Sequence, residues 1–265
     1  MDYFSVVAVG TEVHLFMQAT GPWGKGIQHM ISKDAGASWT GPTKLNLPAG
    51  GPHAPTVGHG VVLSNGDVVV PAVCNASCVL ISSDKGKTWA VGGYGIKGSR
   101  ESSITEVSCP KAAAGSGPCV YINARNMNKP KSDAAAHPRL ESWSSDGGRS
   151  WAPMTASTAL FTPVTPHWTG IVANVVALPK SGALVYAGAS APGARASMAV
   201  STSDSGDGHK WGAKRVIWPG PAGYADVAAL NSTHVGVLYE AGDKSFADRI
   251  QFSVVALKAE LTGKA

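Results

Sequence analysis

The 265-residue sequence predicts an all-β fold, and more narrowly a β-propeller. First, the phrase S-x-D-x-G-x-[ST]-W occurs three times without a gap, at Asp34, Asp84 and Asp146. Second, each interval between copies holds roughly four short strands. Third, no long stretch has the 3.6-residue period of an amphipathic helix. Four strands per repeat without helices is typical of propeller blades around a common axis.

A fourth, degenerate copy of the phrase is STSDSGDGHKW at 201–211, which we align on Asp204. In this copy the spacing from Asp to Trp grows from 5 to 7 residues. The phrase predicts a hairpin turn, in which Ser and Asp side chains accept hydrogen bonds from backbone N–H groups of their own turn. The glycine supplies a positive φ, and the tryptophan packs over the turn. A catalytic or metal-binding role is disfavoured, because a residue needed once has no reason to recur in every blade.

The strands between the repeats are predicted from hairpin patterns. The clearest is 59–73, where two apolar runs flank Asn65-Gly66, the strongest short hairpin signal. The pattern returns at 106–124, at 172–190 with Ser181-Gly182, and at 227–241. No composition shift marks a linker, so we expect residues 1–265 to form a single domain.

Composition excludes several function classes. Charged residues make up 15% and the net charge is +5, but no basic stripe carries interleaved aromatics, so a nucleic-acid partner is not expected. No apolar run reaches the roughly 18 residues of a transmembrane helix. The first ten residues lack the basic region of a signal peptide.

The four cysteines are Cys74, Cys78, Cys109 and Cys119. The last two flank PKAAAGSGP and are placed to bridge the base of a hairpin loop. Without a Cys-x-x-Cys pair or matching histidines, we expect no zinc, no other metal and no cofactor. Sequons at Asn75 and Asn231, with disulfides, would suit a secretory origin if the N-terminus is truncated; because sequons also arise by chance, localisation is left open.

The repeats resemble the Asp-boxes of the sialidase (neuraminidase) superfamily, and the stretches between them extend the resemblance. They are HGVVLSNGDVVVPA, SRESSITEVS with CVYINARN, APGARASMAVSTSD, and GPAGYADVAAL with VGVLYEAGD. Their order and spacing agree with the family from about residue 5 onward. The resemblance implies a six-bladed propeller and an exo-α-sialidase, a glycoside hydrolase that removes terminal sialic acids with retention.

By resemblance, Tyr224 matches the family's nucleophile and Glu101 the base that activates it. A neutral phenol suits a substrate whose anomeric carbon carries a carboxylate, and sialidases depart from the usual two-carboxylate scheme in this way. Glu106 is a rival that strand alternation places on the opposite face. Glu101 is preferred because it falls on the family position, 24 residues before Arg125. The plainer alternatives are a core or rim tyrosine and an exposed strand-end glutamate.

The resemblance also assigns substrate-binding residues. Arg125 and Arg195 match the second and third members of the family's arginine triad, whose planar forks hold the substrate carboxylate. Glu240 matches the glutamate that braces the first arginine. Each has a surface charge as its alternative, and Arg195 has three rivals: Arg100, Arg139 and Arg249.

The pattern departs from the family at its start, where the first blade, with the first triad arginine and the acid/base aspartate, is absent. Before the first repeat the chain has no arginine, and Asp2 is its only aspartate. We therefore expect about five of six blades, or a truncated coding sequence. Loss of one charge-assisted pair costs roughly 1.5–3 kcal/mol, and loss of the acid roughly 10²–10⁴-fold in rate.

The leading interpretation is a sialidase that acts on a sialylated glycoprotein, glycolipid or oligosaccharide. The alternatives are a catalytically impaired, lectin-like propeller that binds sialoglycans, and a scaffold propeller with unrelated partners. Joint presence of Glu101 and Tyr224 favours the enzyme, because a lectin has little need for an activated phenol.

Overall fold

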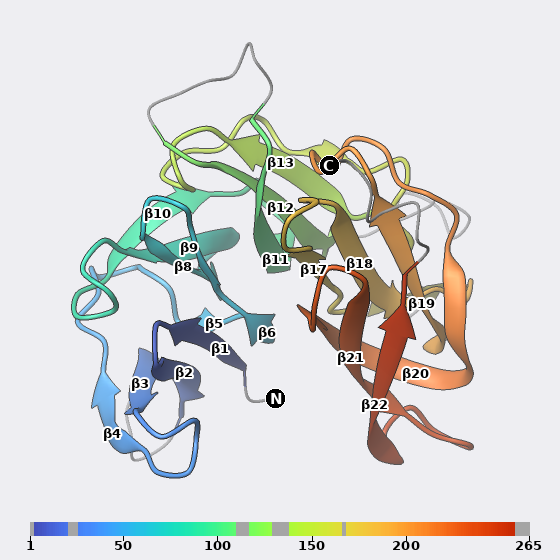
Figure 1. Ribbon diagram of the computed structural model, residues 1–265, viewed down its shortest axis with the longest axis horizontal. Helices are drawn as coiled ribbons and strands as arrows, with labels where there is room; N and C mark the ends of the chain where they lie inside the picture. The colour runs from blue at the N-terminus through green and yellow to red at the C-terminus, as the bar shows by residue number, and fades with distance from the viewer. Residues whose placement is uncertain (1–2, 21–25, 110–116, 129–137, 166–167, 258–265) are drawn as a thin grey trace. The chain divides into compact units, whose positions relative to one another are not determined.

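The computed structural model describes residues 3–20, 26–109, 117–128, 138–165 and 168–257. All regular structure in these ranges is β-strand, as predicted (Figure 1). The ranges hold no helix of the length and apolar character that crossing a membrane takes. Asp2 lies outside the described residues.

The chain divides into two compact units, each described by itself. The first comprises residues 1–106, 111–122 and 142–154, and the second comprises 107–110, 123–141 and 155–265. That the whole chain is one domain stays a prediction.

Two sheets of the first unit are built from neighbouring segments. One has the order β4-β3-β2-β1-β6, in which β6 pairs parallel to β1; its strands are β1 (Phe4–Val9), β2 (Glu12–Ala19), β3 (Gly26–Ser32), β4 (Thr40–Lys44) and β6 (Gly58–His59). The other has the order β10-β9-β8-β5, and β7 also pairs with β8; its strands are β5 (Ala54–Pro55), β7 (Val61–Val62), β8 (Val68–Val73), β9 (Ser77–Ser82) and β10 (Ala90–Tyr94). Strands β8 and β9 are buried throughout, which agrees with the apolar sequence VVVPAV of β8 and the apolar middle CVLI of β9.

A third sheet has the order β11-β12-β13-β14, and the boundary between the units falls within its first three strands. Its strands are β11 (Ser99–Val107), β12 (Cys119–Asn126), β13 (Leu140–Ser144) and β14 (Thr155–Ala156). Strand β12 is buried along nearly its whole length, and it carries Arg125 near its end.

The second unit contains a small sheet of β15 (Val164–Thr165) with β16 (Trp168–Thr169) and a six-stranded antiparallel sheet. The strands of the larger sheet pair in chain order: β17 (Asn174–Ala177), β18 (Leu184–Ala189), β19 (Ala196–Ser203), β20 (Arg215–Ala229), β21 (His234–Ala241) and β22 (Arg249–Ala256). The long strand β20 pairs with β19 through its first half and with β21 through its second half (Figure 1).

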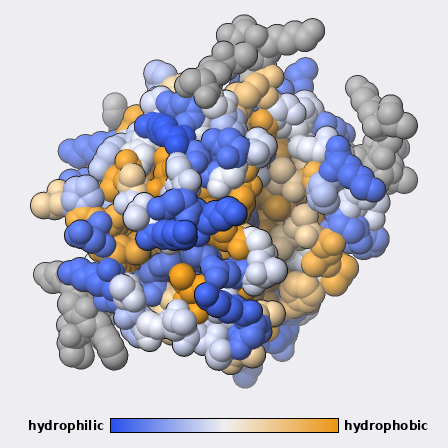
Figure 2. Space-filling view, turned by 60° about the vertical axis from the view of Figure 1, so that its left-hand side comes forward, coloured by the Kyte–Doolittle hydropathy of each residue, from blue (hydrophilic) through white to orange (hydrophobic). Residues whose placement is uncertain are grey.

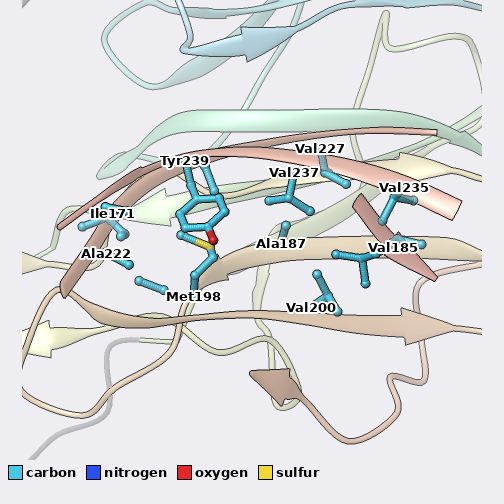
Figure 3. Close-up of a cluster of buried hydrophobic side chains, with 14 of the residues drawn as sticks. Ile171, Val185, Ala187, Met198, Val200, Ala222, Val227, Val235, Val237 and Tyr239 are labelled. Carbon is cyan, nitrogen blue, oxygen red and sulfur yellow. The ribbon is translucent and has the colours of Figure 1, made fainter. Parts of the chain in front are cut away.

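Each unit has its own apolar core. In the six-stranded sheet, buried side chains from β18 to β22 form one cluster, in which Met198 and Tyr239 lie among valines and alanines (Figure 3). In the first unit, Phe16 and Ile27 pack with the apolar residues of β8 and β9. Apolar side chains also reach the surface, as the orange areas among blue ones in Figure 2 show. On β22 the exposed ones are Ile250, Phe252 and Val254.

The first repeat phrase forms the hydrogen-bonded turn that its sequence predicts. Ser32 Oγ accepts the N–H of Gly36 at 2.7 Å, and Asp34 Oδ1 accepts the N–H of Ser38 at 2.8 Å. The indole of Trp39 donates to the carbonyl of Gly36 at 3.0 Å. The hydroxyl and amide of Ser38, with the hydroxyl of Ser32, lower the pKa of Asp34 to about 2.

The second and third copies repeat these bonds. Asp84 accepts the N–H of Thr88 at 2.9 Å, and Asp146 accepts that of Ser150 at 2.9 Å. The glycines of both phrases, Gly86 and Gly148, have positive φ. The aspartates therefore act within their own turns, as predicted.

The alignment of the fourth copy on Asp204 is wrong. Within the described part of this turn, the aspartate that takes the equivalent role is Asp207, whose Oδ1 accepts the N–H of His209 at 2.9 Å and the hydroxyl of Ser205 at 2.6 Å. Asp204 is exposed. The indole of Trp211 donates to the carbonyl of Gly208, three residues earlier, as Trp39 donates to Gly36 in the first copy.

Cys74 and Cys78 form a disulfide with a Cα–Cα distance of 6.0 Å. Cys109 and Cys119 are also disulfide-bonded, so the described ranges contain no free cysteine.

Candidate active site

Tyr224 lies in an irregular part of β20, where the strand crosses from one pairing partner to the other. The register with β21 shifts between Ala222 and Ala225, so Tyr224 falls outside the regular ladder. Its backbone N–H donates instead to Glu240 Oε2 at 3.0 Å. A bulge of this kind re-aims a side chain, and the carboxylate satisfies the amide that the bulge frees from the ladder.

The glycine before the tyrosine makes this contact possible. A Cβ at Gly223 would lie 2.0 Å from Glu240 Oε2 and 3.0 Å from the ring of Phe246. Only a residue without a side chain leaves the carboxylate room to approach the backbone. Gly223 therefore allows the Glu240 carboxylate to approach the backbone of β20 closely, which the sequence pattern did not predict.

Arg195, immediately before β19, lies beside Tyr224. The centre of its guanidinium is 5.3 Å from the centroid of the Tyr224 ring and 4.7 Å from that of the Phe246 ring. The carbonyl of Arg195 accepts the N–H of Ala222 at 3.0 Å, which anchors its backbone to β20. Thus the second unit brings together three of the predicted residues, Arg195, Tyr224 and Glu240.

Phe246 is a member of this cluster that the sequence analysis missed. It lies in the loop between β21 and β22, whose sequence, GDKSFAD, reads as an ordinary polar turn. The sequence signal for it is a lone aromatic residue in a polar loop soon after the Y-E pair.

The loop around Phe246 is organised by the carboxylate of Asp248. Its Oδ2 accepts three backbone N–H groups, those of Asp243, Lys244 and Ser245, at 3.1, 3.0 and 3.0 Å. These bonds favour the ionised carboxyl and lower the pKa of Asp248. A Cβ at Gly242 would lie 1.8 Å from the carbonyl oxygen of Ser245, so this loop also depends on a glycine.

Arg125 and Arg139, one of the three rivals of Arg195, are both buried, at 6% and 1% exposure. The donors of Arg139 serve the protein itself: Nε binds Asn123 Oδ1 at 2.7 Å, and one terminal nitrogen binds the carbonyl of Ile171 at 2.8 Å. Its guanidinium also lies over the ring of Tyr186 at 5.7 Å. The structure therefore assigns Arg139 to the interior of the unit.

Another rival, Arg249, is held on the surface. Its guanidinium reaches both carboxylate oxygens of Asp243 at 3.2 Å and lies 5.1 Å from the Trp218 ring. Half-exposed charges paired in this way contribute little to stability, but they fix the side chain.

Glu101, on β11 in the first unit, is 5% exposed. Its Oε1 accepts the phenol O–H of Tyr3 at 2.9 Å, a partner that the sequence analysis did not predict. The rival Glu106 accepts both the amide and the hydroxyl of Ser64, so it braces a hairpin turn. Because Glu101 and Tyr224 belong to different units, their pairing stays a prediction.

Chemically, the cluster in the second unit places a permanent cation against the ring of a phenol, beside a carboxylate that fixes the backbone of that phenol. A guanidinium so placed suits an anionic ligand and stabilises negative charge on a neighbouring oxygen. In the described ranges no three His, Cys, Asp or Glu side chains are grouped to hold a metal ion.

Comparison with known proteins gives these residues a context. A sialidase of Micromonospora viridifaciens is 26% identical over 199 residues, which are 72% of this chain and 27% of that protein. A Hadza microbial sialidase superposes with a TM-score of 0.73 at 19% identity, over 97% of this chain and 52% of its own. The sialidase of Trypanosoma rangeli gives 0.70 at 19% identity, over 98% and 45%.

The chain thus spans about a quarter of the curated relative and about half of the two solved structures. The likeness confirms the predicted fold class, an all-β propeller of the sialidase type; absence of the first blade stays a prediction. The sequence profile of the BNR repeat-like domain matches residues 4–237. The chain therefore belongs to the family of BNR repeat-like domains, and with it to the sialidase superfamily.

Proposed function

We propose that this chain carries the nucleophile and carboxylate-binding part of an exo-α-sialidase site, a retaining glycoside hydrolase acting on terminal sialic acids of glycoproteins, glycolipids or oligosaccharides. The observation that carries the proposal is the guanidinium of Arg195 lying 5.3 Å from the Tyr224 ring, with Glu240 bonded to the Tyr224 amide. Arginine beside a phenol is the combination that an anionic sugar with a carboxylate at its anomeric carbon requires.

In the proposed reaction Arg195 and Arg125 bind the substrate carboxylate, each through paired N–H donors. Tyr224 Oη attacks the anomeric carbon while its proton passes to Glu101. The bond from that carbon to the leaving oxygen breaks, and the leaving oxygen takes up a proton from solvent. Water then attacks the tyrosyl-linked sugar and releases a proton to solvent, while the bond to Tyr224 Oη breaks and the phenolate recovers its proton from Glu101. Two inversions give net retention.

The role of Glu240 differs from a simple brace for an arginine. Its Oε2 accepts the N–H of Tyr224, which fixes the bulge that carries the nucleophile. A carboxylate that orients the backbone of a nucleophile reduces the freedom lost on reaching the transition state. Glu240 is therefore a positioning residue in this proposal.

Hydrolysis of 4-methylumbelliferyl α-N-acetylneuraminide tests the proposal, because this leaving group needs little help from an acid. We expect slow turnover that is abolished in Tyr224→Phe and retained in the control Tyr94→Phe, whose ring is 55% exposed on β10. Proton NMR of the first product should show the α-anomer. A 3-fluorosialyl fluoride should add its sugar mass to the peptide that contains Tyr224.

The other two functions are outcomes of the same experiment. Binding of sialyllactose without turnover or label would overturn the enzyme proposal in favour of a lectin. Absence of both turnover and binding at millimolar ligand would favour the scaffold. Turnover that survives Tyr224→Phe would reject the tyrosine as nucleophile.

A further inference from the structure

The loop from β21 to β22 supplies a feature of the candidate site beyond the residues already assigned. Phe246 and Tyr224 are contributed by separate segments, the loop and strand β20, and the guanidinium of Arg195 lies over both rings, at 4.7 and 5.3 Å. Phe246 is half-buried and carries no polar group, so its contact with Arg195 is made by the ring alone.

We infer that Phe246 is a positioning residue: its ring, held in place by the loop that Asp248 organises, fixes the plane of the Arg195 guanidinium for binding the substrate carboxylate. This inference rests on the proposed function for the identity of the ligand. The contact between the Phe246 ring and the guanidinium of Arg195 is observed directly and does not depend on that function.

Two arginines of the same unit show why ring contact suits this task. Arg139 is fixed by hydrogen bonds that use its donors on Asn123 and the carbonyl of Ile171. Stacking on a ring orients a guanidinium by its face. The plane fixed in this way sets the direction in which the N–H groups can meet a carboxylate.

Hydrogen bonds and an ion pair fix the loop that carries Phe246. Asp248 gathers the amides of Asp243, Lys244 and Ser245, the three residues directly before Phe246. Arg249, at the start of β22, pairs with Asp243 across the same loop. Gly242 allows the close approach of the Ser245 carbonyl, since any Cβ there would overlap it. The loop is thus fixed at both ends and along its backbone.

Direct observation of the Arg195 side chain tests the inference without any need for activity. In the full chain labelled with ¹⁵N, the Nε–Hε signal of Arg195 is assigned by its loss in Arg195→Lys. We expect a ring-current shift that changes in Phe246→Leu and in Asp248→Asn, and that is kept in Phe246→Tyr. The matched controls are Phe252→Leu, an exposed phenylalanine on β22, and Asp204→Asn, an exposed aspartate.

Ligand binding provides the second readout. We expect Phe246→Leu to weaken binding of the methyl α-glycoside of N-acetylneuraminic acid by about 2- to 30-fold, the range of a cation–π contact. Its neutral methyl ester should bind weakly and equally to both proteins. Phe246→Tyr should retain the affinity of the unaltered chain.

The outcomes separate this inference from the proposed function. An unaltered chain that binds neither glycoside rejects the proposed function, while the Arg195 signal still decides whether Phe246 positions the guanidinium. If Phe246→Leu leaves the Arg195 signal and the acid affinity unchanged, the inference is wrong. The Nε–Hε signal of Arg139 serves as the folding control. If it is lost in Phe246→Leu, that variant is misfolded, and the test is whether the Arg195 signal is kept in Phe246→Tyr and changed in Asp248→Asn.

Discussion

The most quantitative prediction concerns a buried pair of histidines in the first unit. His14 on β2 and His29 on β3 are 1% and 9% exposed, and His14 Nδ1 lies 2.9 Å from His29 Nε2. The ring of His29 stacks on Phe16 at 4.7 Å, and the turn of the second repeat covers the pair. A Cβ at Gly86 in that turn would lie 2.3 Å from His14 Cε1, so the turn packs directly against the ring of His14.

Burial, together with a smaller contribution from the charge of the neighbouring His14, lowers the pKa of His29 from 6.5 to about 4. Burial also lowers the pKa of His14, against the opposing charge of Glu12, whose Oε2 lies 3.6 Å from His14 Nε2. Glu12 is itself paired with Lys33 at 3.4 Å. The pair is therefore held neutral near pH 7.

Acid should destabilise this unit, because His29 takes up a proton in the unfolded chain at a pH at which it is still neutral in the folded chain. Above pH 6.5 both states are neutral at His29 and its titration has no effect. As pH falls from 6.5 to about 4, stability falls by up to 1.36 kcal/mol per pH unit, or about 3 kcal/mol in total. Between pH 6.5 and 5.0 the expected loss is about 2 kcal/mol, a sizeable part of a typical free energy of unfolding.

The perturbation is His29→Gln, which keeps a hydrogen-bonding group but does not titrate. Urea unfolding, followed by tryptophan fluorescence from pH 4 to 8, should show a smaller pH dependence in this variant by about 1 kcal/mol or more at pH 5. His209→Gln, at an exposed position, is the control and should follow the unaltered chain. An equal pH dependence in His29→Gln and the unaltered chain would refute the reasoning, as would an NMR titration of His29 centred near 6.5.

Two further predictions concern single residues of the second unit. Gly223→Ala should lower kcat/KM for the 4-methylumbelliferyl sialoside at least tenfold, because the new Cβ displaces the Glu240 carboxylate. The control is Gly212→Ala, whose Cβ would meet nothing nearer than 3.5 Å, and it should leave kcat/KM unchanged. Arg139→Met should lower the free energy of unfolding by about 3 kcal/mol in urea titrations, because it leaves Asn123 Oδ1 and the Ile171 carbonyl without a donor, whereas the exposed Lys33→Met should change it by less than about 1 kcal/mol.

The parts of the fold that follow from local chemistry were predictable. Gly66 of the predicted hairpin and the glycines of the first three repeats have a positive φ, which a residue without a Cβ adopts readily, so their turns can be read from the local sequence. The first three repeat turns obey the same local logic, since Ser32 and Asp34 bond atoms within four residues of themselves. The fourth was misaligned because two aspartates, Asp204 and Asp207, lie three residues apart, and only the backbone path decides which one faces the turn.

The candidate site was predictable only in part, because its members lie on segments far apart in the sequence. Resemblance supplied Arg195, Tyr224 and Glu240, and the second unit brings them together. It did not supply Phe246, whose role depends on where a loop folds back, or the bond between Tyr3 and Glu101, which joins residues 98 positions apart. Such contacts are fixed by packing across strands, which a single sequence does not encode at any constant spacing.

The two arginines show most clearly what sequence leaves undecided. Arg139 and Arg195 have the same charge, and each directly precedes a strand, β13 and β19 respectively. Their chemistry diverges because Arg139 meets carbonyls from a segment more than thirty residues away, whereas Arg195 meets the faces of two rings. Carbonyl partners tie a guanidinium to the protein interior, while aromatic rings fix its plane. In this chain the two rings come from strand β20 and from the loop that holds Phe246, so the proposed binding role of Arg195 depends on segments far from it in the sequence.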